Sequence, residues 1–329
     1  MALVVLTLAS TPIEAARPAN KLPLRRVADV RLPGSPSRFD YQDIDSARRR
    51  LYVAHLGAGQ VDVVDLESSK VVGVVPDVPA VHGVRVAPDL AVVYASATRD
   101  DAVVAIDEST LAAIARVPTG RFPDGLAYDP SDRVVYVSNK NAGSLTAFEA
   151  TAARQPQTIE VADETGNVVY DPTTMTVRIA ARTPDQLAEV NPQSGEVTSR
   201  LELPGCKGAH GLYLEPEANL AFVACEDNGR LSTVDLTNNR QRDTTTVGKT
   251  PDVLAYDAGL HRLYVASESG IVTVFELRGS ALEKLGESRL APHAHSVAVD
   301  PATHRAYFPL QDVRGHPTLR VMEPTSGGR

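Results

Sequence analysis

The chain has 329 residues, of which 43% are hydrophobic and 22% are charged, a composition typical of a soluble globular protein with a large core. Its formal net charge of −8 argues against nucleic acid or an anionic membrane surface as the main partner. No stretch after the N-terminus is apolar over the length that a transmembrane helix needs. Tryptophan is absent, so aliphatic side chains and tyrosines must build the core.

The first 20 residues resemble the later part of a secretory signal. An apolar stretch over residues 2–9 is followed by small residues and a cleavage point near residue 15 or 16, although the positively charged start of a signal is missing. We assign residues 1–20 to a leader and residues 21–329 to the folded domain. The expected location is the periplasm or the extracellular space.

Turn-delimited strands repeat along the rest of the chain. Each unit begins with a short alternating strand that ends in an acidic residue, and a polar turn and three further apolar strands follow. The acidic anchors recur every 42 to 44 residues, with one alanine among them: Asp45, Ala87, Asp129, Asp171, Glu215, Asp257 and Asp300. Four strands in this length is the size of a propeller blade, whereas helical repeats would show a 3.6-residue period.

Seven anchors predict an all-β fold, a single seven-bladed β-propeller of four-stranded blades. The seventh unit lacks a fourth strand, because the chain ends soon after its third. The unassigned run LPLRRVADVRLP, residues 22–33, can fill this place and close the ring without an open sheet edge.

The second strands read YVSN at 136–139 and LYVA at 51–54 and 263–266, and third strands of the V-D-L type follow. In these motifs the chain resembles the YVTN-type, YncE-like and surface-layer-like β-propellers over nearly its full length. The resemblance implies a seven-bladed fold and export, and it specifies function poorly. Larger seven-bladed relatives include lactonase-type enzymes and the haem-d1-binding domain of a nitrite reductase, but no motif here carries over their catalytic residues.

Ligand-capable side chains occupy one repeated position, five residues before each anchor. These positions, here called the ring, are Asp40, His82, Asp124, Gly166, His210, Asp252 and His295. Each lies at the start of an innermost strand, and innermost strands line the central channel. We therefore expect the ring at one mouth of the channel, with His261 and His304 in turns on the opposite face.

The ring histidines predict a metal site. His82, His210 and His295 come from blades two, five and seven and could converge on one divalent transition-metal ion, zinc, copper or iron. The ring aspartates would orient these imidazoles or act as ligands themselves. His293, two residues before His295, could reach the same mouth or remain a solvated loop residue.

Basic residues stand near the ring in sequence. Arg121, Lys207 and Lys249 lie three positions before it, and Arg38 lies in the first entry loop. A cationic surround in a protein of negative charge favours a small anionic ligand. The predicted ligand-binding set therefore comprises Asp40, Asp124, Asp252, Arg121, Lys207 and Lys249.

Other interpretations of the ring remain open at this stage. Its polar side chains could only hydrogen-bond neighbouring loops and hold the blades in register. The site could belong to a metal-assisted hydrolase of the lactonase type or to an oxidoreductase, and the enzyme question is left open. The chain could also be a non-catalytic scaffold that binds a protein partner on its broad face. The sequence contains no GxSxG nucleophile elbow, which argues against a serine-esterase mechanism.

The chain has two cysteines, Cys206 and Cys225, both expected on the mouth face of blade five. Export favours a disulfide between them, which would stabilise the fold by about 3 kcal/mol. If they were reduced, the pair would instead offer thiolate ligands suited to copper or zinc.

Overall fold

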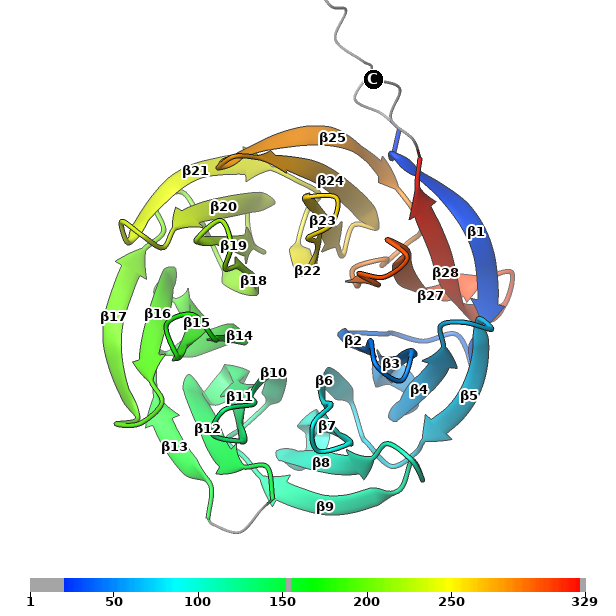
Figure 1. Cartoon of the computed structure of the whole chain (residues 1–329), viewed down its shortest axis with the longest axis horizontal. Coiled ribbons are helices and arrows are strands. Elements are labelled where there is room, and N and C mark those ends of the chain that lie inside the picture. The colour runs from blue at the N-terminus through cyan, green and yellow to red at the C-terminus, as the bar shows by residue number, and fades with distance from the viewer. Residues whose placement is uncertain (1–20, 152–154, 326–329) are drawn as a thin grey trace, which may run out of the picture.

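The computed structural model describes residues 21–151 and 155–325. Seven antiparallel sheets of four strands surround a central channel, as the sequence predicts (Figure 1). The predicted leader, residues 1–20, lies outside the described residues. Within the described part of the chain, no helix combines the length and apolar character needed to cross a membrane.

Each blade runs from an innermost to an outermost strand. Blades one to three consist of β2 Gln42–Asp45, β3 Arg50–His55, β4 Gln60–Asp65 and β5 Lys70–Val75; β6 Val81–Ala87, β7 Val92–Ala97, β8 Ala102–Asp107 and β9 Ala113–Pro118; β10 Pro123–Asp129, β11 Val134–Asn139, β12 Ser144–Glu149 and β13 Gln157–Glu160. Blades four to six consist of β14 Glu164–Asp171, β15 Thr176–Thr183, β16 Gln186–Asn191 and β17 Glu196–Glu202; β18 Ala209–Glu215, β19 Leu220–Cys225, β20 Arg230–Asp235 and β21 Arg240–Thr246; β22 Pro251–Asp257, β23 Arg262–Ser267, β24 Ile271–Arg278 and β25 Ala281–Arg289. Blade seven consists of β26 Ala298–Val299, β27 Ala306–Val313, β28 His316–Pro324 and β1 Leu24–Arg31, and short 3₁₀ turns follow three second strands, η1 Leu56–Ala58, η2 Thr98–Asp100 and η3 Lys140–Ala142.

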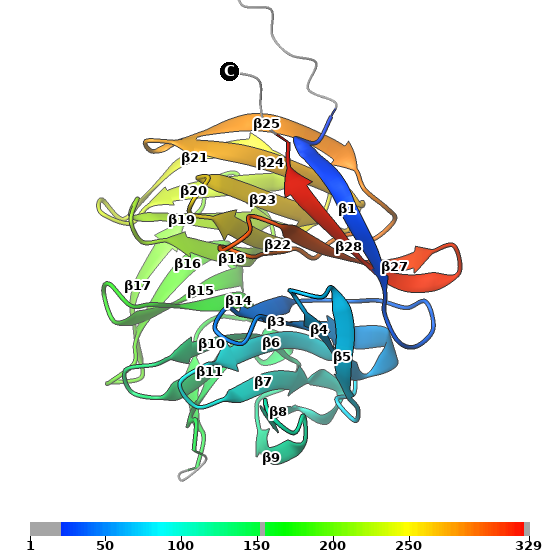
Figure 2. The same ribbon diagram turned by 45° about the vertical axis from the view of Figure 1, so that its right-hand side comes forward.

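The last blade is closed by the two ends of the described chain. Strand β1 pairs antiparallel with β28, with Leu24 opposite Pro324 and Arg31 opposite Thr318. Figure 2 shows the two strands side by side. The prediction that residues 22–33 supply the missing strand is confirmed. The pairing completes the seventh sheet and closes the circle of seven blades.

The repeated tyrosine of the second strand explains how the blades pack. The tyrosine seven residues after the anchor is at most 2% exposed in five blades: Tyr52, Tyr94, Tyr136, Tyr264 and Tyr307. Blade five has Phe222 at this place, also fully buried. In these six blades a large aromatic side chain at a fixed position fills the space between neighbouring sheets and replaces the missing tryptophan, whereas blade four has Arg178 there.

The anchor acids act as turn caps. Asp129 Oδ1 accepts a hydrogen bond from the N–H of Ser131 at 2.8 Å, and Asp45 Oδ1 does the same for Ala47 at 2.8 Å. The last residue of each such turn adopts a left-handed conformation, which includes His261 (φ 52°) and His304 (φ 60°). These two histidines therefore lie in turns between first and second strands, as expected, and not at the ring.

Candidate metal centre

The ring residues lie at the beginning of the innermost strands and are largely hidden from solvent. The exposed fractions of five of them are 4% or less: Asp40, Asp124, His210, Asp252 and His295. His82 is half-buried. Repeat counting thus located a buried polar layer, formed by loops that are up to 255 residues apart in the sequence.

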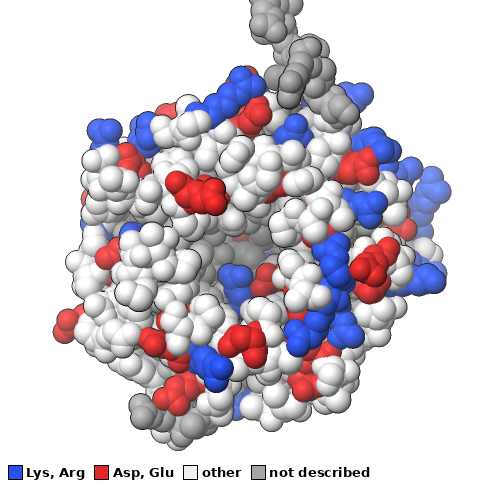
Figure 3. All heavy atoms as spheres, viewed as in Figure 1, with Lys and Arg blue, Asp and Glu red and all other residues white. Residues whose placement is uncertain are grey.

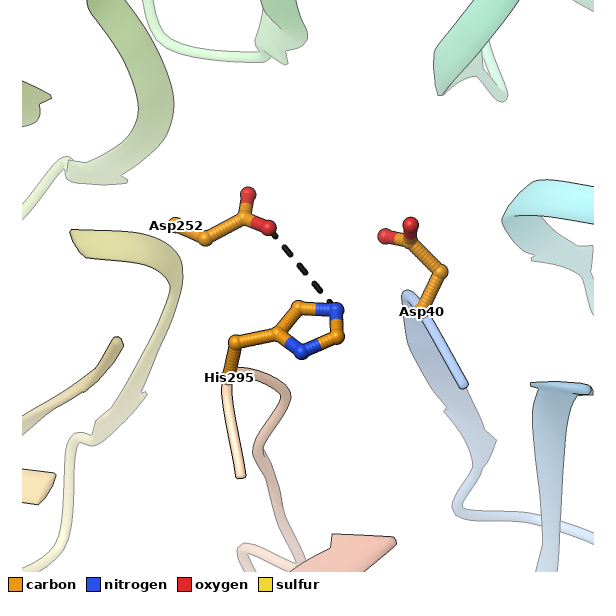
Figure 4. A group of neighbouring side chains, drawn as sticks. All are labelled: Asp40, Asp252 and His295. Atoms are coloured by element: carbon orange, nitrogen blue, oxygen red, sulfur yellow. Dashed lines mark ion pairs between the residues drawn. The ribbon is translucent and has the colours of Figure 1, made fainter. Parts of the chain in front are cut away.

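Three of these side chains converge on one point. Asp40, Asp252 and His295 each offer one ligand atom, and these atoms lie within 4.8 Å of one another. Figure 4 shows the three groups pointing toward one another from blades one, six and seven. Among residues 21–151 and 155–325, this is the one group of three or more His, Cys, Asp or Glu side chains with such close ligand atoms.

The converging groups carry unused ligand atoms. Asp40 Oδ1, Asp252 Oδ1 and His295 Nε2 are buried and have no hydrogen-bond partner among the described residues. Leaving a buried polar atom without a partner costs about 1–3 kcal/mol, and more for a charged group. Each of the three converging groups keeps one such atom, which is expected of a site that binds a cation.

The orientation of His295 suits metal ligation. Its Nδ1 lies 3.0 Å from the carbonyl oxygen of His293, so Nδ1 carries the proton and donates. The lone pair of the imidazole is therefore on Nε2, the atom that faces Asp252 at 3.9 Å. A backbone carbonyl that fixes the tautomer in this way is the usual partner of a ligating histidine.

His82 and His210 lie in the same ring but outside this group. His82 Nδ1 lies 2.8 Å from the carbonyl oxygen of Ala80 and 2.9 Å from Thr98 Oγ1. His210 Nε2 lies 3.4 Å from Asp252 Oδ1 and 3.7 Å from Asp124 Oδ2. The convergence of His82, His210 and His295 on one ion stays a prediction, and the mixed set of two aspartates and one histidine is the arrangement with the closest atoms.

Burial and crowded carboxylates raise the pKa of Asp252 well above its ordinary value. Burial is the largest cause, and repulsion from Asp40, Glu226, Asp124 and Glu268 adds to it. The ring therefore holds more negative charge than its own cations neutralise, and a divalent ion between Asp40 and Asp252 would relieve this repulsion.

The opposite side of the ring behaves differently. Burial alone would raise the pKa of Asp124, but electrostatic interactions with His210, His82, Lys140 and Arg38 outweigh it and lower that pKa. The pKa of His210 is also lowered, first by burial and then by Lys140. Its imidazole is therefore neutral near neutral pH and can accept a proton.

A second layer of charged residues surrounds the ring, and the sequence interpretation identified only Arg38 among them. Glu268 Oε2 lies 3.5 Å from Nδ1 of His295 and also from Nδ1 of the exposed His293. Arg38 bridges Glu268 Oε1 at 2.5 Å and Asp40 Oδ2 at 3.6 Å. Glu268, like Glu226 and Lys140, stands eleven residues after its anchor, directly after a second strand. The same repeat counting applied to that position would have found these residues.

The predicted basic surround occupies the loops rather than the ring. Arg121, Lys207 and Lys249 are exposed, and Arg121 donates to the carbonyl oxygen of Asn141 at 3.1 Å. No ion pair joins any of the three to a ring residue in the described parts of the chain. Their role in ligand binding stays a prediction.

Gly166 and the two cysteines each have a structural explanation. A Cβ atom at Gly166 would lie 2.5 Å from the Cα of His210, so glycine is required there by the close approach of blade five. Cys206 and Cys225 form the expected disulfide, with 5.2 Å between their Cα atoms. This bond ties the loop that carries Lys207 to the end of β19.

The channel widens below the ring. A cavity of about 710 Å³ begins at the residues that follow ring positions, such as Tyr41 and Gly125, and ends at anchor-turn prolines such as Pro88 and Pro130. The anchor turns face the viewer in Figure 1, and Figure 3 shows this face hollowed at its centre. The buried ring therefore separates this cavity from the loops of the other mouth.

Comparison with known proteins supports the fold and gives one pointer to function. Residues 77–178 match the sequence profile of the family described as "Lactonase, 7-bladed beta-propeller". This segment covers blades two and three and part of blade four, and includes His82 and Asp124. No curated protein matches the chain.

Many solved structures share the architecture at low sequence identity. A chain of the hydrazine synthase of Kuenenia stuttgartiensis is 16% identical and superposes with a TM-score of 0.76 over 87% of this chain and 96% of that one. A chain of a mitotic checkpoint complex is 12% identical, with a TM-score of 0.79 over 98% of each chain. The WD40 repeats of RRP9 are 10% identical, with a TM-score of 0.76 over 91% of this chain and 100% of that one. These likenesses establish the propeller fold alone.

Proposed function

We propose that this propeller binds one divalent transition-metal ion at the channel mouth, between Asp40, Asp252 and His295, and takes a small anionic ligand onto that ion. The observation that carries the proposal is the convergence of three buried ligand groups, each of which keeps one buried atom without a hydrogen bond. Mixed oxygen and imidazole ligands suit zinc, iron or copper. Three protein ligands leave coordination positions for an external molecule.

The anionic character of the external ligand is inferred from the cations around the ion. A divalent ion would offset both ligating carboxylates, and Arg38 and Lys140 offset part of the charge of the other carboxylates beside the ring, Asp124, Glu226 and Glu268. The exposed Arg121, Lys207 and Lys249 would attract an anion toward this mouth. Export is part of the proposal, because the disulfide is of the kind that persists in oxidising compartments.

Metal titration of the chelator-treated protein tests the proposal. We expect one zinc or cobalt ion per chain in calorimetry, and stabilisation of about 2.7 kcal/mol at a free metal concentration 100 times the dissociation constant. Asp252→Asn and His295→Ala should weaken binding at least tenfold, whereas His304→Ala, which changes a histidine on the other face, should bind as the wild type does. Failure of the wild type to bind any of zinc, cobalt, iron or copper would disprove the proposal.

A second candidate function, metal-assisted hydrolysis of a lactone or ester, is favoured by the match of residues 77–178 to the lactonase family. The ion would polarise the substrate carbonyl or lower the pKa of a bound water. His210, which lies 3.4 Å from Asp252 and has a lowered pKa, would accept the proton. Lactone hydrolysis that is lost on chelation and in His210→Gln, but kept in His304→Ala, would support this activity, and activity that survives chelation would exclude it.

A further inference from the structure

A second constellation lies in blade one, beside the metal centre but separate from it. Ser37 Oγ is 2.9 Å from His55 Nε2, and His55 Nδ1 is 3.0 Å from Asp62 Oδ2. Ser37 belongs to the loop between β1 and β2, His55 ends β3, and Asp62 lies on β4. A hydroxyl, an imidazole and a carboxylate in this order and at these distances have the geometry of a nucleophile, its base and the group that orients the base.

The imidazole is held in the tautomer that such a site needs. His55 and Asp62 are both 0% exposed, and Phe39 stacks on the imidazole with 4.1 Å between ring centroids. Gln60 Nε2 donates to Asp62 Oδ1 at 2.6 Å, which leaves Oδ2 for His55. Because Asp62 is an acceptor, Nδ1 carries the proton and Nε2 is free to accept one from Ser37.

The other blades show that a propeller blade does not need an ionisable pair at this place. The pairs at the same positions in blades two to six are neutral: Ala97 and Val104, Asn139 and Thr146, Ala181 and Ala188, Cys225 and Ser232, Ser267 and Thr273. In blade three, Asn139 Nδ2 donates to Thr146 Oγ1 at 2.9 Å, so a neutral hydrogen bond suffices to join the two strands. Burying a carboxylate with an imidazole is more costly than these solutions, and packing alone does not account for it.

Ser37 is placed on the side of the blade that ligands can reach. It stands three residues before Asp40, the repeat position that Arg121, Lys207 and Lys249 occupy with exposed side chains. Ser37 itself is half-buried, and its hydroxyl also lies 3.2 Å from the carbonyl oxygen of Ser35. The N–H groups of Ser37 and Arg38 donate to no main-chain carbonyl of the described residues.

We propose that Ser37, His55 and Asp62 form a hydrolytic site for small carboxylic esters, independent of the bound metal. Ser37 Oγ attacks the ester carbonyl carbon while its proton passes to His55 Nε2. The carbon–oxygen bond to the alcohol then breaks, and the departing oxygen takes that proton. Water, deprotonated by His55, attacks the acyl-serine and releases the carboxylic acid, and Ser37 regains its proton. Asp62 acts as a positioning residue through His55.

Covalent labelling with a fluorophosphonate probe tests the site. We expect mass spectrometry to find the probe on Ser37 of the folded wild-type protein, with labelling lost in Ser37→Ala and kept in the matched variant Ser35→Ala. Chelation of metal should leave labelling unchanged, so failure of the metal proposal and failure of this one are distinguishable. A wild-type protein without label on Ser37, or one labelled only when unfolded, would overturn the proposal.

Steady-state hydrolysis of p-nitrophenyl acetate separates the role of Asp62 from a purely structural one. Asp62→Asn should lower kcat at least about 100-fold while KM and the melting temperature stay close to wild type. Thr146→Val, which removes the equivalent hydrogen bond in blade three, should leave kcat unchanged. Equal kcat values in wild type, Ser37→Ala and Asp62→Asn would contradict the proposal.

Discussion

The two faces of the propeller use aspartate at repeated positions in opposite ways. On the anchor face, Asp300 receives two hydrogen bonds from Arg49, at 2.8 and 2.7 Å, and further bonds from Ala302 and Thr303. At the ring, Asp40 and Asp252 each keep a buried oxygen without a partner. Satisfied carboxylates hold a fold together, whereas unsatisfied ones at equal burial indicate a ligand.

The pKa values reflect the same contrast. Burial alone would raise the pKa of Asp300, but hydrogen bonds from Arg49 and Thr303 outweigh it and lower the pKa to about 2. Asp252 is also buried, but its charged neighbours are mostly carboxylates, and its pKa is raised well above the ordinary value. The fold therefore gains stability from ionised Asp300 and loses stability from ionised Asp252.

The largest change in stability is expected from removing the charge of an anchor aspartate. Asp300→Asn removes the charge that Arg49 needs, and the loss of one partner of a buried ion pair should lower the free energy of unfolding by about 3 kcal/mol. Urea unfolding of the metal-free protein measures this. A loss below about 0.5 kcal/mol would show that the anchor acids are not structural.

A smaller effect of opposite sign is expected at the ring. Because the folded-state pKa of Asp252 lies above its unfolded value of about 4, its contribution to stability is complete below that pH and declines as the pH rises through the folded pKa. Asp252→Asn should remove this decline and stabilise the metal-free protein at pH 8, by on the order of 1 kcal/mol. Unfolding curves at pH 5 and pH 8 check this, and a variant less stable than wild type at pH 8 would contradict the account of the ring.

Unfolding measured at acid pH tests the role of Asp300 in the same way. Asp300 has a lowered pKa, so its contribution is complete above about pH 4 and is lost as the pH falls toward 2. In Asp300→Asn, the fall in stability between pH 4 and pH 2 should be shallower than in the wild type. If stability falls as steeply with pH in the variant as in the wild type, groups other than Asp300 cause the acid sensitivity.

The smallest effect is expected for His304, the anchor-face histidine that serves as a control. Its Nδ1 lies 2.9 Å from Asp257 Oδ1, but the side chain is 37% exposed, so the pair is partly screened by solvent. His304→Ala should cost less than about 1 kcal/mol and leave metal binding unchanged. Loss of bound metal in this variant would mean that the anchor face also holds an ion.

Repeat counting predicted the fold and the ring but not the contacts within the ring. The period of the anchors fixed seven blades, and the unpaired seventh unit indicated the role of β1. The convergence of particular ring residues depends on the directions of their side chains, and the spacing of residues in the sequence does not give these directions. A main-chain carbonyl holds Nδ1 of both His82 and His295, and the spacing does not show that Nε2 of His295 would lie beside Asp252.

The constellation in blade one has no sequence signature at all. Ser37, His55 and Asp62 are separated by 18 and 7 residues and belong to a loop and two strands. Only the equivalents of His55 and Asp62 in blades two to six, which are neutral, reveal that blade one is unusual. Such a comparison between repeats is available from the sequence once the register of the strands is known.

The most direct test of the account is a crystal of the chelator-treated protein soaked in zinc and measured at the zinc absorption edge. The account predicts one strong anomalous peak about 2.0–2.2 Å from a carboxylate oxygen of Asp40, one of Asp252 and Nε2 of His295. A peak shared by His82, His210 and His295 would restore the three-histidine site. The absence of any peak at the ring would contradict the claim that its buried atoms without hydrogen-bond partners bind a cation.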